Sequence, residues 1–187
     1  VIGGQSGGGK TAFAISGLVT PAAIGGSGVL LCSLEDSAVS VACRAIADLG
    51  NISNKQLQRR DISSAREYGE ACAAGKRLAG TELYVIDTPP ESVDSLCAQI
   101  TRHCNEIDTS LVVIDFMQYI SSGLGRGNAT AHEDHVVKTI AMMARRLKTT
   151  ATVLLTQLRG IPDEQEPTPN DIRGSKSARH FAHTIAI

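Results

Sequence analysis

The sequence predicts an α/β fold in which a mainly parallel central sheet is flanked by helices on both faces. Short, almost continuously apolar segments rich in β-branched residues alternate with helix-forming stretches, a pattern typical of strands buried on both faces. Aromatic residues make up only 3 % of the chain and Trp is absent, so Val, Ile, Leu and Ala must build the core. The 187 residues are enough for one domain, which we expect to span residues 1–187.

The individual elements follow from these patterns. Interior strands are expected at Val29–Ser33, 83–87, Leu111–Asp115 and 152–156. The segments 1–2 and 184–187 are interpreted as two further strands, giving about six in total. Helices are expected over residues 11–19, 37–49, 92–105 and 132–148. Loops are expected over residues 17–28, 121–131 and 159–170, which are rich in Gly, Ser, Asn, Pro or acidic residues.

Charge, cysteine content and hydropathy restrict the class of protein. The net charge is −1, so any nucleic-acid contact must come from local loops rather than from a basic surface as a whole. An odd count of five cysteines without a C-x-x-C pair favours reduced, buried thiols in a cytosol-like compartment. No apolar run reaches the length of a membrane span. The start before a Gly-rich loop, without Met, and the end inside an apolar segment suggest truncation at both ends.

A phosphate-binding motif follows the first strand segment. The pattern G-x-x-x-x-G-K-[ST] is matched by Gly4, Gln5, Ser6, Gly7, Gly8, Gly9, Lys10 and Thr11. Glycines let successive backbone N–H groups curl around a phosphate, and the helix that follows favours an anion at its N-terminus. Lys10 would reach the β- and γ-phosphates, and the Thr11 hydroxyl would hold Mg²⁺. The motif therefore predicts binding of ATP with Mg²⁺.

A second acid is needed to orient the Mg²⁺ shell. Asp115 closes the apolar segment Leu111–Asp115, which would place it at the carboxyl edge of the sheet beside the phosphate loop. Asp87 also ends an apolar run, but Thr88 and two prolines follow it, so a capping role fits it better. We therefore expect Asp115 to be the Mg²⁺ residue.

Two further polar residues end strands. Glu35 follows Val29–Ser33, and from a neighbouring strand it could polarise the water that attacks the γ-phosphate, although an acid there can also be an ordinary N-cap neighbour. Gln157 follows 152–156, and its amide could contact the γ-phosphate or could simply be a polar residue that leaves a strand.

A basic cluster lies near the C-terminus. It contains Arg173, Lys176 and Arg179 around a turn formed by Gly174 and Ser175. Cations, hydroxyls and backbone amides suit a nucleic-acid phosphate backbone, although a solvated basic turn would look the same.

Taken in order, these motifs resemble the DnaB-type replicative helicases and the related phage primase-helicases, which have a RecA-like ATPase fold. The most specific matches are S-L-E at 33–35, I-D-aromatic-x-Q at 114–118 and T-Q-L-R at 156–159. Further matching segments are 4–14, 83–89 and 171–175, so the resemblance covers nearly the whole chain.

The resemblance implies a role for each residue. Lys10 and Thr11 would bind phosphates and Mg²⁺, Glu35 would be the catalytic base, Asp115 the Mg²⁺ residue and Gln157 the γ-phosphate sensor. The loops after Asp115 and after Gln157, the latter beginning with Arg159, would contact single-stranded DNA inside a homo-hexameric ring. Primase and a helicase loader are possible further partners, and the implied location is cytoplasmic.

The chain departs from the bacterial pattern after residues 173–175. Residues 178–183 are closer to the phage primase-helicase version, which has a basic residue at the position of Arg179 and suggests a phage or mobile-element branch. The arginine finger of the family would lie beyond Ile187. Two alternatives remain open from the residues: a RecA- or RadA-like recombination ATPase, and a nucleotide-gated loader or clamp.

Overall fold

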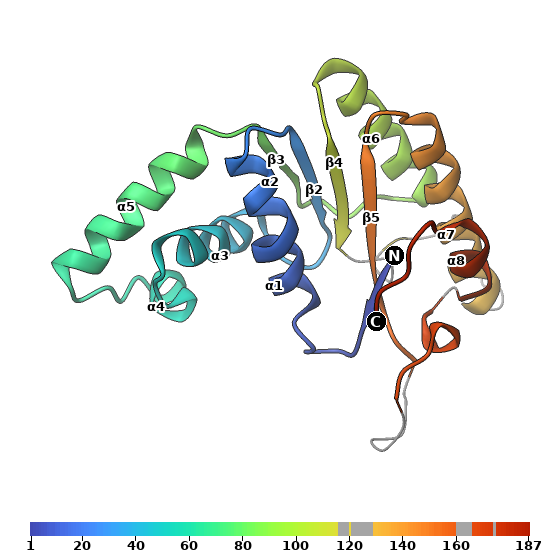
Figure 1. Ribbon diagram of the computed structural model, residues 1–187, viewed down its shortest axis with the longest axis horizontal. Helices are drawn as coiled ribbons and strands as arrows, with labels where there is room; N and C mark the ends of the chain where they lie inside the picture. Colours follow the sequence, from blue (N-terminus) through green and yellow to red (C-terminus); the bar gives the residue numbers. More distant parts are fainter. Residues whose placement is uncertain (116–119, 121–128, 160–165, 174) are drawn as a thin grey trace.

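The chain forms one parallel sheet with helices on both faces. The computed structural model describes residues 1–115, 120, 129–159, 166–173 and 175–187 (Figure 1). The strands are β1 (Ile2–Gly4), β2 (Val29–Ser33), β3 (Leu83–Ile86), β4 (Leu111–Asp115) and β5 (Ala151–Gln157). Their order in the sheet is β1-β5-β4-β2-β3, and every neighbouring pair is parallel. The α/β fold expected from the sequence is confirmed.

The expected sixth strand, at 184–187, is wrong for the described part of the chain. This segment forms an isolated bridge between Ile2 and Ala186. Two backbone hydrogen bonds accompany it: Gly3 N–H donates to the Ala186 carbonyl at 2.8 Å, and Ala186 N–H donates to the Val1 carbonyl at 3.0 Å. Because β1 has only three residues, the partner segment has too short an edge on which to extend a ladder.

The first helical stretch is longer than expected. Helix α1 (Lys10–Ala14), a π-helical turn (Ile15–Val19) and helix α2 (Thr20–Ile24) follow one another without a break in helical backbone geometry. The expected loop at 17–28 is therefore wrong over residues 17–24. Pro21 is the second residue of α2, directly after the π-helical turn. Burial of Ile15 and Val19 on the sheet holds the turn in place.

The remaining helices include two that the sequence patterns did not indicate. Three match expected ones within a few residues: α3 (Ala38–Gly50), α6 (Val93–Glu106) and α7 (Ala129–Arg146). The unexpected pair is α4 (Asn54–Arg59) and α5 (Ala65–Ala79). Near the C-terminus, a 3₁₀ turn (Pro169–Asp171) precedes α8 (Ser175–Phe181).

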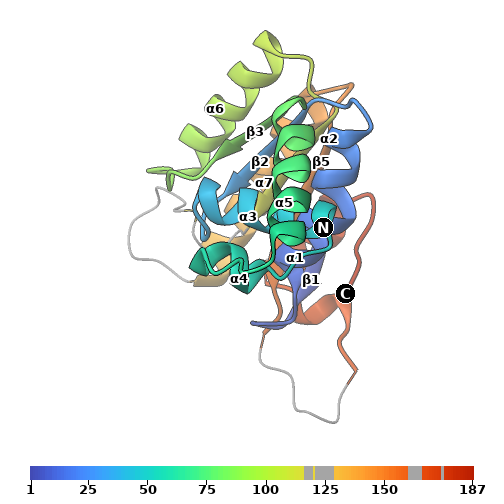
Figure 2. The same ribbon diagram turned by 90° about the vertical axis from the view of Figure 1, so that its left-hand side faces the viewer.

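Successive residues along each strand point to opposite faces of the sheet, so the core has one part on each face. Leu30, Cys32, Val112 and Ile114 pack with α6, α7 and α8. Val29, Leu31, Val113 and Leu155 pack with α1, the π-helical turn, α2 and α3 on the other face. Figures 1 and 2 show the two groups of helices on either side of the sheet. All five strands run parallel, so their carboxyl ends meet along one edge, where the expected site residues lie.

Candidate nucleotide-binding site

The phosphate loop connects the end of β1 to the start of α1. Gly7 has a φ of 72° and Gly9 a φ of 81°, a left-handed conformation that L side chains rarely adopt. Gly8 N–H donates to the Gln5 carbonyl at 3.1 Å, which closes the turn. Residues 5–9 are exposed, so the loop backbone is accessible to a ligand. The loop therefore has the form that the motif requires for holding phosphate.

Lys10 is positioned by the loop that precedes it. Its ammonium group donates to the carbonyl of Gly4 at 3.0 Å and to the carbonyl of Gln5 at 2.7 Å. Burial lowers the pKa of Lys10, and the nearby carboxylates of Asp115 and Glu35 act in the opposite direction. The lysine thus carries its charge at the loop with two acids close enough to influence it.

Asp115 lies at the end of β4 with only 2 % of its surface exposed. Burial raises the pKa of its carboxyl, the hydrogen bond from Thr11 opposes this shift, and Glu35 and Asp36 raise the pKa further. Its Oδ1 atom is buried and has no hydrogen-bond partner within the described residues. A buried carboxylate oxygen without a donor, beside a threonine hydroxyl, suits a divalent cation.

Glu35 and Gln157 line the same cavity as the phosphate loop. Its volume is about 260 Å³, and its walls include Ser6, Gly7, Gly9, Lys10, Thr11, Glu35 and Gln157. Gln157 pairs in register with Gly4 across β5 and β1. Leu34 N–H donates to the Asp115 carbonyl at 2.7 Å, which fixes the turn carrying Glu35 against the end of β4.

The order of the strands corrects one expectation. Glu35 was expected to face the γ-phosphate from a neighbouring strand, whereas Asp115 was expected at the carboxyl edge beside the phosphate loop, where its contact with Thr11 places it. In the sheet, β5 lies next to β1, and β4 and β2 follow in turn. The residues still meet because parallel strands share their carboxyl edge and because Thr11 reaches across to Asp115.

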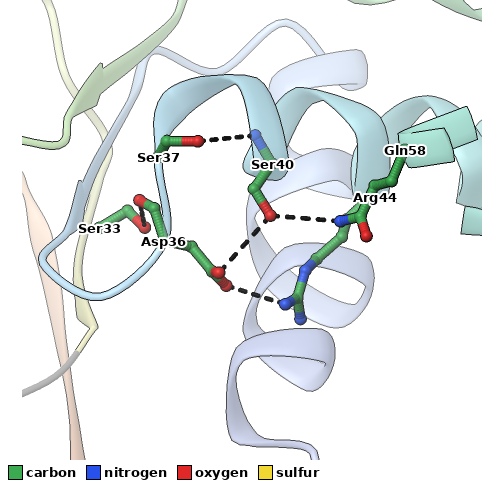
Figure 3. Close-up of polar contacts among 6 residues, drawn as sticks. All are labelled: Ser33, Asp36, Ser37, Ser40, Arg44 and Gln58. Atoms are coloured by element: carbon green, nitrogen blue, oxygen red, sulfur yellow. Dashed lines mark hydrogen bonds and ion pairs between the residues drawn. The ribbon is translucent and has the colours of Figure 1, made fainter. Parts of the chain in front are cut away.

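Two charged residues of the cavity lining were not identified as binding residues from the sequence. Asp36 and Arg44 also line the cavity, and they form an ion pair of 2.9 Å between Oδ2 and Nη2 (Figure 3). The spacing of four residues places Ser40 and Arg44 on one face of α3, and Asp36, in the turn before the helix, contacts both. This spacing was the available signal, but it indicates a shared face and not which cavity the face borders.

Asp87 has the capping role that its sequence context favoured. Its Oδ2 accepts a hydrogen bond of 2.8 Å from the backbone N–H of Ala38, the first residue of α3. Ser37 caps the same helix by accepting from Ser40 N–H at 3.3 Å. Asp87 therefore stabilises α3, and Asp115 is the acid in contact with Thr11.

Among the residues expected to contact DNA, Arg159 and Arg173 come together around Glu133 of α7. The distances to its carboxylate oxygens are 3.9 Å from Arg159 and 3.6 Å from Arg173. Backbone hydrogen bonds connect the same segments: Arg159 N–H donates to the Asp171 carbonyl at 2.7 Å, and Arg173 N–H to the Gln157 carbonyl at 3.3 Å. The strand end at Gln157 is thus tied directly to both arginines.

Helix α8 begins at Ser175, the second of the two residues at which a turn was expected. Arg179 is exposed in the last turn of α8. Gly174 and the side chains of Ser175 and Lys176 lie outside the described part of the chain, as does nearly all of the expected loop at 121–131. Asp134 accepts from Ser177 N–H at 3.1 Å and so fixes the start of α8 on α7.

The described residues also bear on metal binding, membrane spans and the state of the cysteines. Across the described residues, no three or more His, Cys, Asp or Glu side chains are grouped so as to hold a metal ion by themselves. None of the helices described is long and apolar enough to cross a membrane. All five cysteines are free, and Cys32 and Cys97 are buried. Cys43 and Cys104 are half-buried and Cys72 is exposed, so the expectation of buried thiols holds only for Cys32 and Cys97.

Comparisons with known proteins give the same picture. The family of DnaB-like helicase C-terminal domains matches residues 1–187. The replicative DNA helicase DnaB of Geobacillus stearothermophilus is 29 % identical over 182 residues, which is 96 % of this chain and 40 % of the relative. A probable plasmid replicative DNA helicase of Chlamydia trachomatis is 28 % identical over 179 residues, 95 % of this chain and 39 % of the relative. The chain thus spans about two fifths of the length of these relatives.

Solved structures share the fold. One of them, described as an ATPase domain, superposes with a TM-score of 0.87 at 22 % identity, covering 98 % of this chain and 66 % of that one. A DnaB-like replicative helicase, studied with its interactions with primase, has a TM-score of 0.87 at 23 % identity over 98 % of this chain and 46 % of that one. Since the family match extends from the first residue to the last, the chain belongs to the family of DnaB-like helicase C-terminal domains.

Proposed function

We propose that this chain is the ATP-hydrolysing motor domain of a replicative DNA helicase and that it works with Mg²⁺. One observation carries the proposal: the phosphate loop after β1, the start of α1, the turn after β2 and the end of β5 meet around one cavity at the carboxyl edge of the sheet, and Asp115 at the end of β4 contacts Thr11 of its wall. These residues supply the backbone cradle, the cation and the carboxylates that phosphoryl transfer to water requires.

Each side chain then has a distinct task. The backbone of Gly4, Gln5, Ser6, Gly7, Gly8 and Gly9 surrounds the phosphates. Lys10 offsets charge on the β- and γ-phosphates, for which it must exchange its loop carbonyl partners for phosphate oxygens. Thr11 and Asp115 hold Mg²⁺, and the buried Oδ1 of Asp115 is the observation that favours this assignment. When bound, the ion neutralises charge on the phosphate oxygens.

Glu35 and Gln157 act on the reacting end of the nucleotide. Glu35 accepts a proton from the attacking water and orients that water, as a general base does. Gln157 donates its amide N–H to the γ-phosphate and loses this contact when the phosphate leaves. The backbone carbonyl of Gln157 accepts a hydrogen bond from the backbone N–H of Arg173. Through this bond the change at the nucleotide reaches the segment expected to contact DNA.

The partners proposed for the full protein are single-stranded DNA and further copies of itself in a hexameric ring. Arg159, Arg173, Gly174, Ser175, Lys176 and Arg179 are proposed to contact or brace the DNA phosphate backbone. Primase and a helicase loader are proposed as additional partners, in line with the structural neighbour whose interactions with primase were studied.

Separation of a forked DNA duplex tests the function. A protein carrying this domain should separate the strands only with ATP and Mg²⁺, and Lys10→Ala should abolish the reaction. Binding and pairing of strands without separation would instead indicate a recombination ATPase. ATP turnover that does not respond to single-stranded DNA would indicate a loader or clamp.

A further inference from the structure

A second cation borders the proposed nucleotide cavity, and the roles assigned above do not use it. Arg44 extends from α3 toward Asp36 in the turn after β2 (Figure 3). Arg44 and Lys10 both line the cavity. The two cations come from different elements, Lys10 from the start of α1 and Arg44 from the middle of α3. A bound anion in the cavity would therefore lie near both.

Asp36 holds the Arg44 guanidinium through one nitrogen only. The ion pair joins Nη2 to Oδ2 at 2.9 Å, while Nε is buried without a hydrogen-bond partner among the described residues. A paired carboxylate and guanidinium can form two parallel hydrogen bonds, which is the stronger arrangement. The single contact leaves guanidinium N–H groups that can donate to another acceptor.

Asp36 keeps its position by contacts that do not involve Arg44. Its backbone carbonyl accepts a hydrogen bond of 2.7 Å from the Ser33 hydroxyl. Its Oδ1 accepts a longer one of 3.5 Å from Ser40, whose hydroxyl in turn accepts from Gln58 at 3.3 Å. The acid would thus remain in place if the arginine turned from it toward a bound anion.

The charges around the cavity indicate what that anion is. The lining contains two cations, Lys10 and Arg44, and two carboxylates, Glu35 and Asp36. Asp115 adds a third carboxylate close to Lys10. With Arg44 neutralised by Asp36, a polyphosphate would face the remaining carboxylates with Lys10 and one divalent ion as its counter-charges. Turning Arg44 toward the phosphates adds a cation where the negative charge is greatest.

We propose that Arg44 is a phosphate-binding residue of this site and that Asp36 holds it in place until a nucleotide binds. The proposal rests on the proposed nucleotide-binding function. It predicts that the two members of the ion pair affect nucleotide affinity differently. Loss of the arginine removes a contact to the ligand and weakens binding, whereas loss of the acid removes a competitor for the arginine. A purely structural ion pair would give the same effect from either side.

Titration of the 187-residue chain with the fluorescent analogue mant-ATP in Mg²⁺ tests this difference. Arg44→Ala should weaken binding roughly ten- to a hundredfold, as loss of a charge-assisted hydrogen bond does. Arg44→Lys should fall between this variant and the unmodified chain, because the ammonium keeps the charge without the planar donor set. Asp36→Asn should bind as tightly as the unmodified chain, or a few-fold more tightly. Inorganic pyrophosphate should displace mant-ATP less effectively from Arg44→Ala, since the lost contact is to phosphate.

Arg66→Ala is the matched control, because it breaks another arginine–carboxylate pair, with Glu70, on α5 away from the cavity. It should bind mant-ATP normally, and circular dichroism should show that every variant is folded. Equal weakening by Asp36→Asn and Arg44→Ala would overturn the proposal, as would normal binding by Arg44→Ala. If Lys10→Ala bound mant-ATP as well as the unmodified chain, the proposed nucleotide site itself would be wrong.

Discussion

The carboxylate of Asp87 accepts a hydrogen bond of 2.8 Å from the backbone N–H of Ala38, so the end of β3 caps the start of α3. The helix therefore has two N-terminal acceptors, since Ser37 also contributes its hydroxyl. Asp115 ends β4 in a comparable place on a nearby strand, yet its contact is with Thr11 of the phosphate loop. Two acids with similar sequence context thus have different tasks, one structural and one at the proposed Mg²⁺ site.

The first prediction separates these tasks. Asp87→Ala should lower the free energy of unfolding by about 1 kcal/mol, as loss of a helix cap does. For a chain of this size that corresponds to roughly 2–4 °C in the melting midpoint. Nucleotide binding should be retained once the protein is folded. Thermal unfolding and mant-ATP titration measure both quantities, and loss of nucleotide binding in folded Asp87→Ala would assign this acid to the site.

The second prediction concerns Asp115 and pH. Burial raises the pKa of its carboxyl above the ordinary 3.8. The native state therefore binds this proton more tightly than the unfolded chain, and the free energy of unfolding falls as pH rises from 3.8 toward the native pKa. Asp115→Asn removes this loss of stability, so without ligand the variant should have a higher melting temperature than the unmodified chain at neutral pH. The difference in melting temperature should shrink as the pH falls toward the ordinary pKa.

Mg²⁺ with ATP should reverse the order of stability. A ligand that binds only the native state raises its stability, and Asp115→Asn should lose most of this gain because the proposed Mg²⁺ oxygen is gone. Melting curves at several pH values, with and without Mg²⁺ and ATP, give the comparison. A variant that is less stable at neutral pH without ligand would show that the hydrogen bond from Thr11 outweighs the cost of burying the charge.

The third prediction concerns turnover. Glu35→Gln should still bind ATP in an assembled protein that carries this domain, but should hydrolyse it on the order of a hundredfold more slowly, as loss of a general base does. Single-turnover hydrolysis of radiolabelled ATP measures the rate apart from binding. Normal turnover by this variant would make Asp36 the next candidate for the base.

Much of the fold and the proposed site could be predicted because the responsible patterns are local. The phosphate loop is one contiguous motif, and Asp115 and Gln157 each end a recognisable apolar strand. The strand order could not be predicted, since it depends on which strands pair. Even so, the shared carboxyl edge brought the expected residues together, because that property belongs to every parallel sheet.

The features that were missed depend on tertiary contacts or on weak local signals. Helix α5 has a Ser64 cap and a following Gly80, but its interior Gly residues and mixed polarity obscure a helical stripe. The ion pair joins Arg44 of α3 to Asp36 in the turn before that helix, and only the fold shows that a cavity lies beside them. Likewise, no sequence pattern connected Glu133 with Arg159 and Arg173.

The fourth prediction tests the two-sided core through its thiols. Burial raises the pKa of Cys32 to about 12 and that of Cys97 to about 11, whereas Cys72 is exposed on α5. Reaction with Ellman's reagent should therefore show one fast thiol, which Cys72→Ser removes. Cys32 and Cys97 should react only when the protein unfolds, because the thiolate is the reactive form. Fast reaction of Cys32 in native protein would contradict the packing of β2 against α6.

The final prediction concerns DNA and rests on the position of Glu133 between two arginines. Arg159 and Arg173 approach its carboxylate at 3.9 and 3.6 Å, and both arginines are nearly half exposed, at 47 % and 41 %. Such long, partly exposed ion pairs are weak, so DNA phosphates can compete with Glu133 for the guanidinium groups. Arg159→Ala and Arg173→Ala should each weaken single-strand binding for all sequences and reduce the slope of log affinity against log salt by about 0.7 per lost phosphate contact.

Glu133→Gln should have the opposite effect, because it removes the competing charge and leaves both arginines in place. Fluorescence anisotropy of a labelled oligothymidine, measured over a series of KCl concentrations, gives the affinities and the slopes, with Arg66→Ala as the matched control. If the arginine variants kept the original slope, the two arginines would serve to hold α7 against the end of β5, and DNA contact would have to be sought at residues 121–131. If Glu133→Gln weakened binding as much as the arginine variants do, the cluster would position the DNA-contacting segments and would not itself contact phosphate.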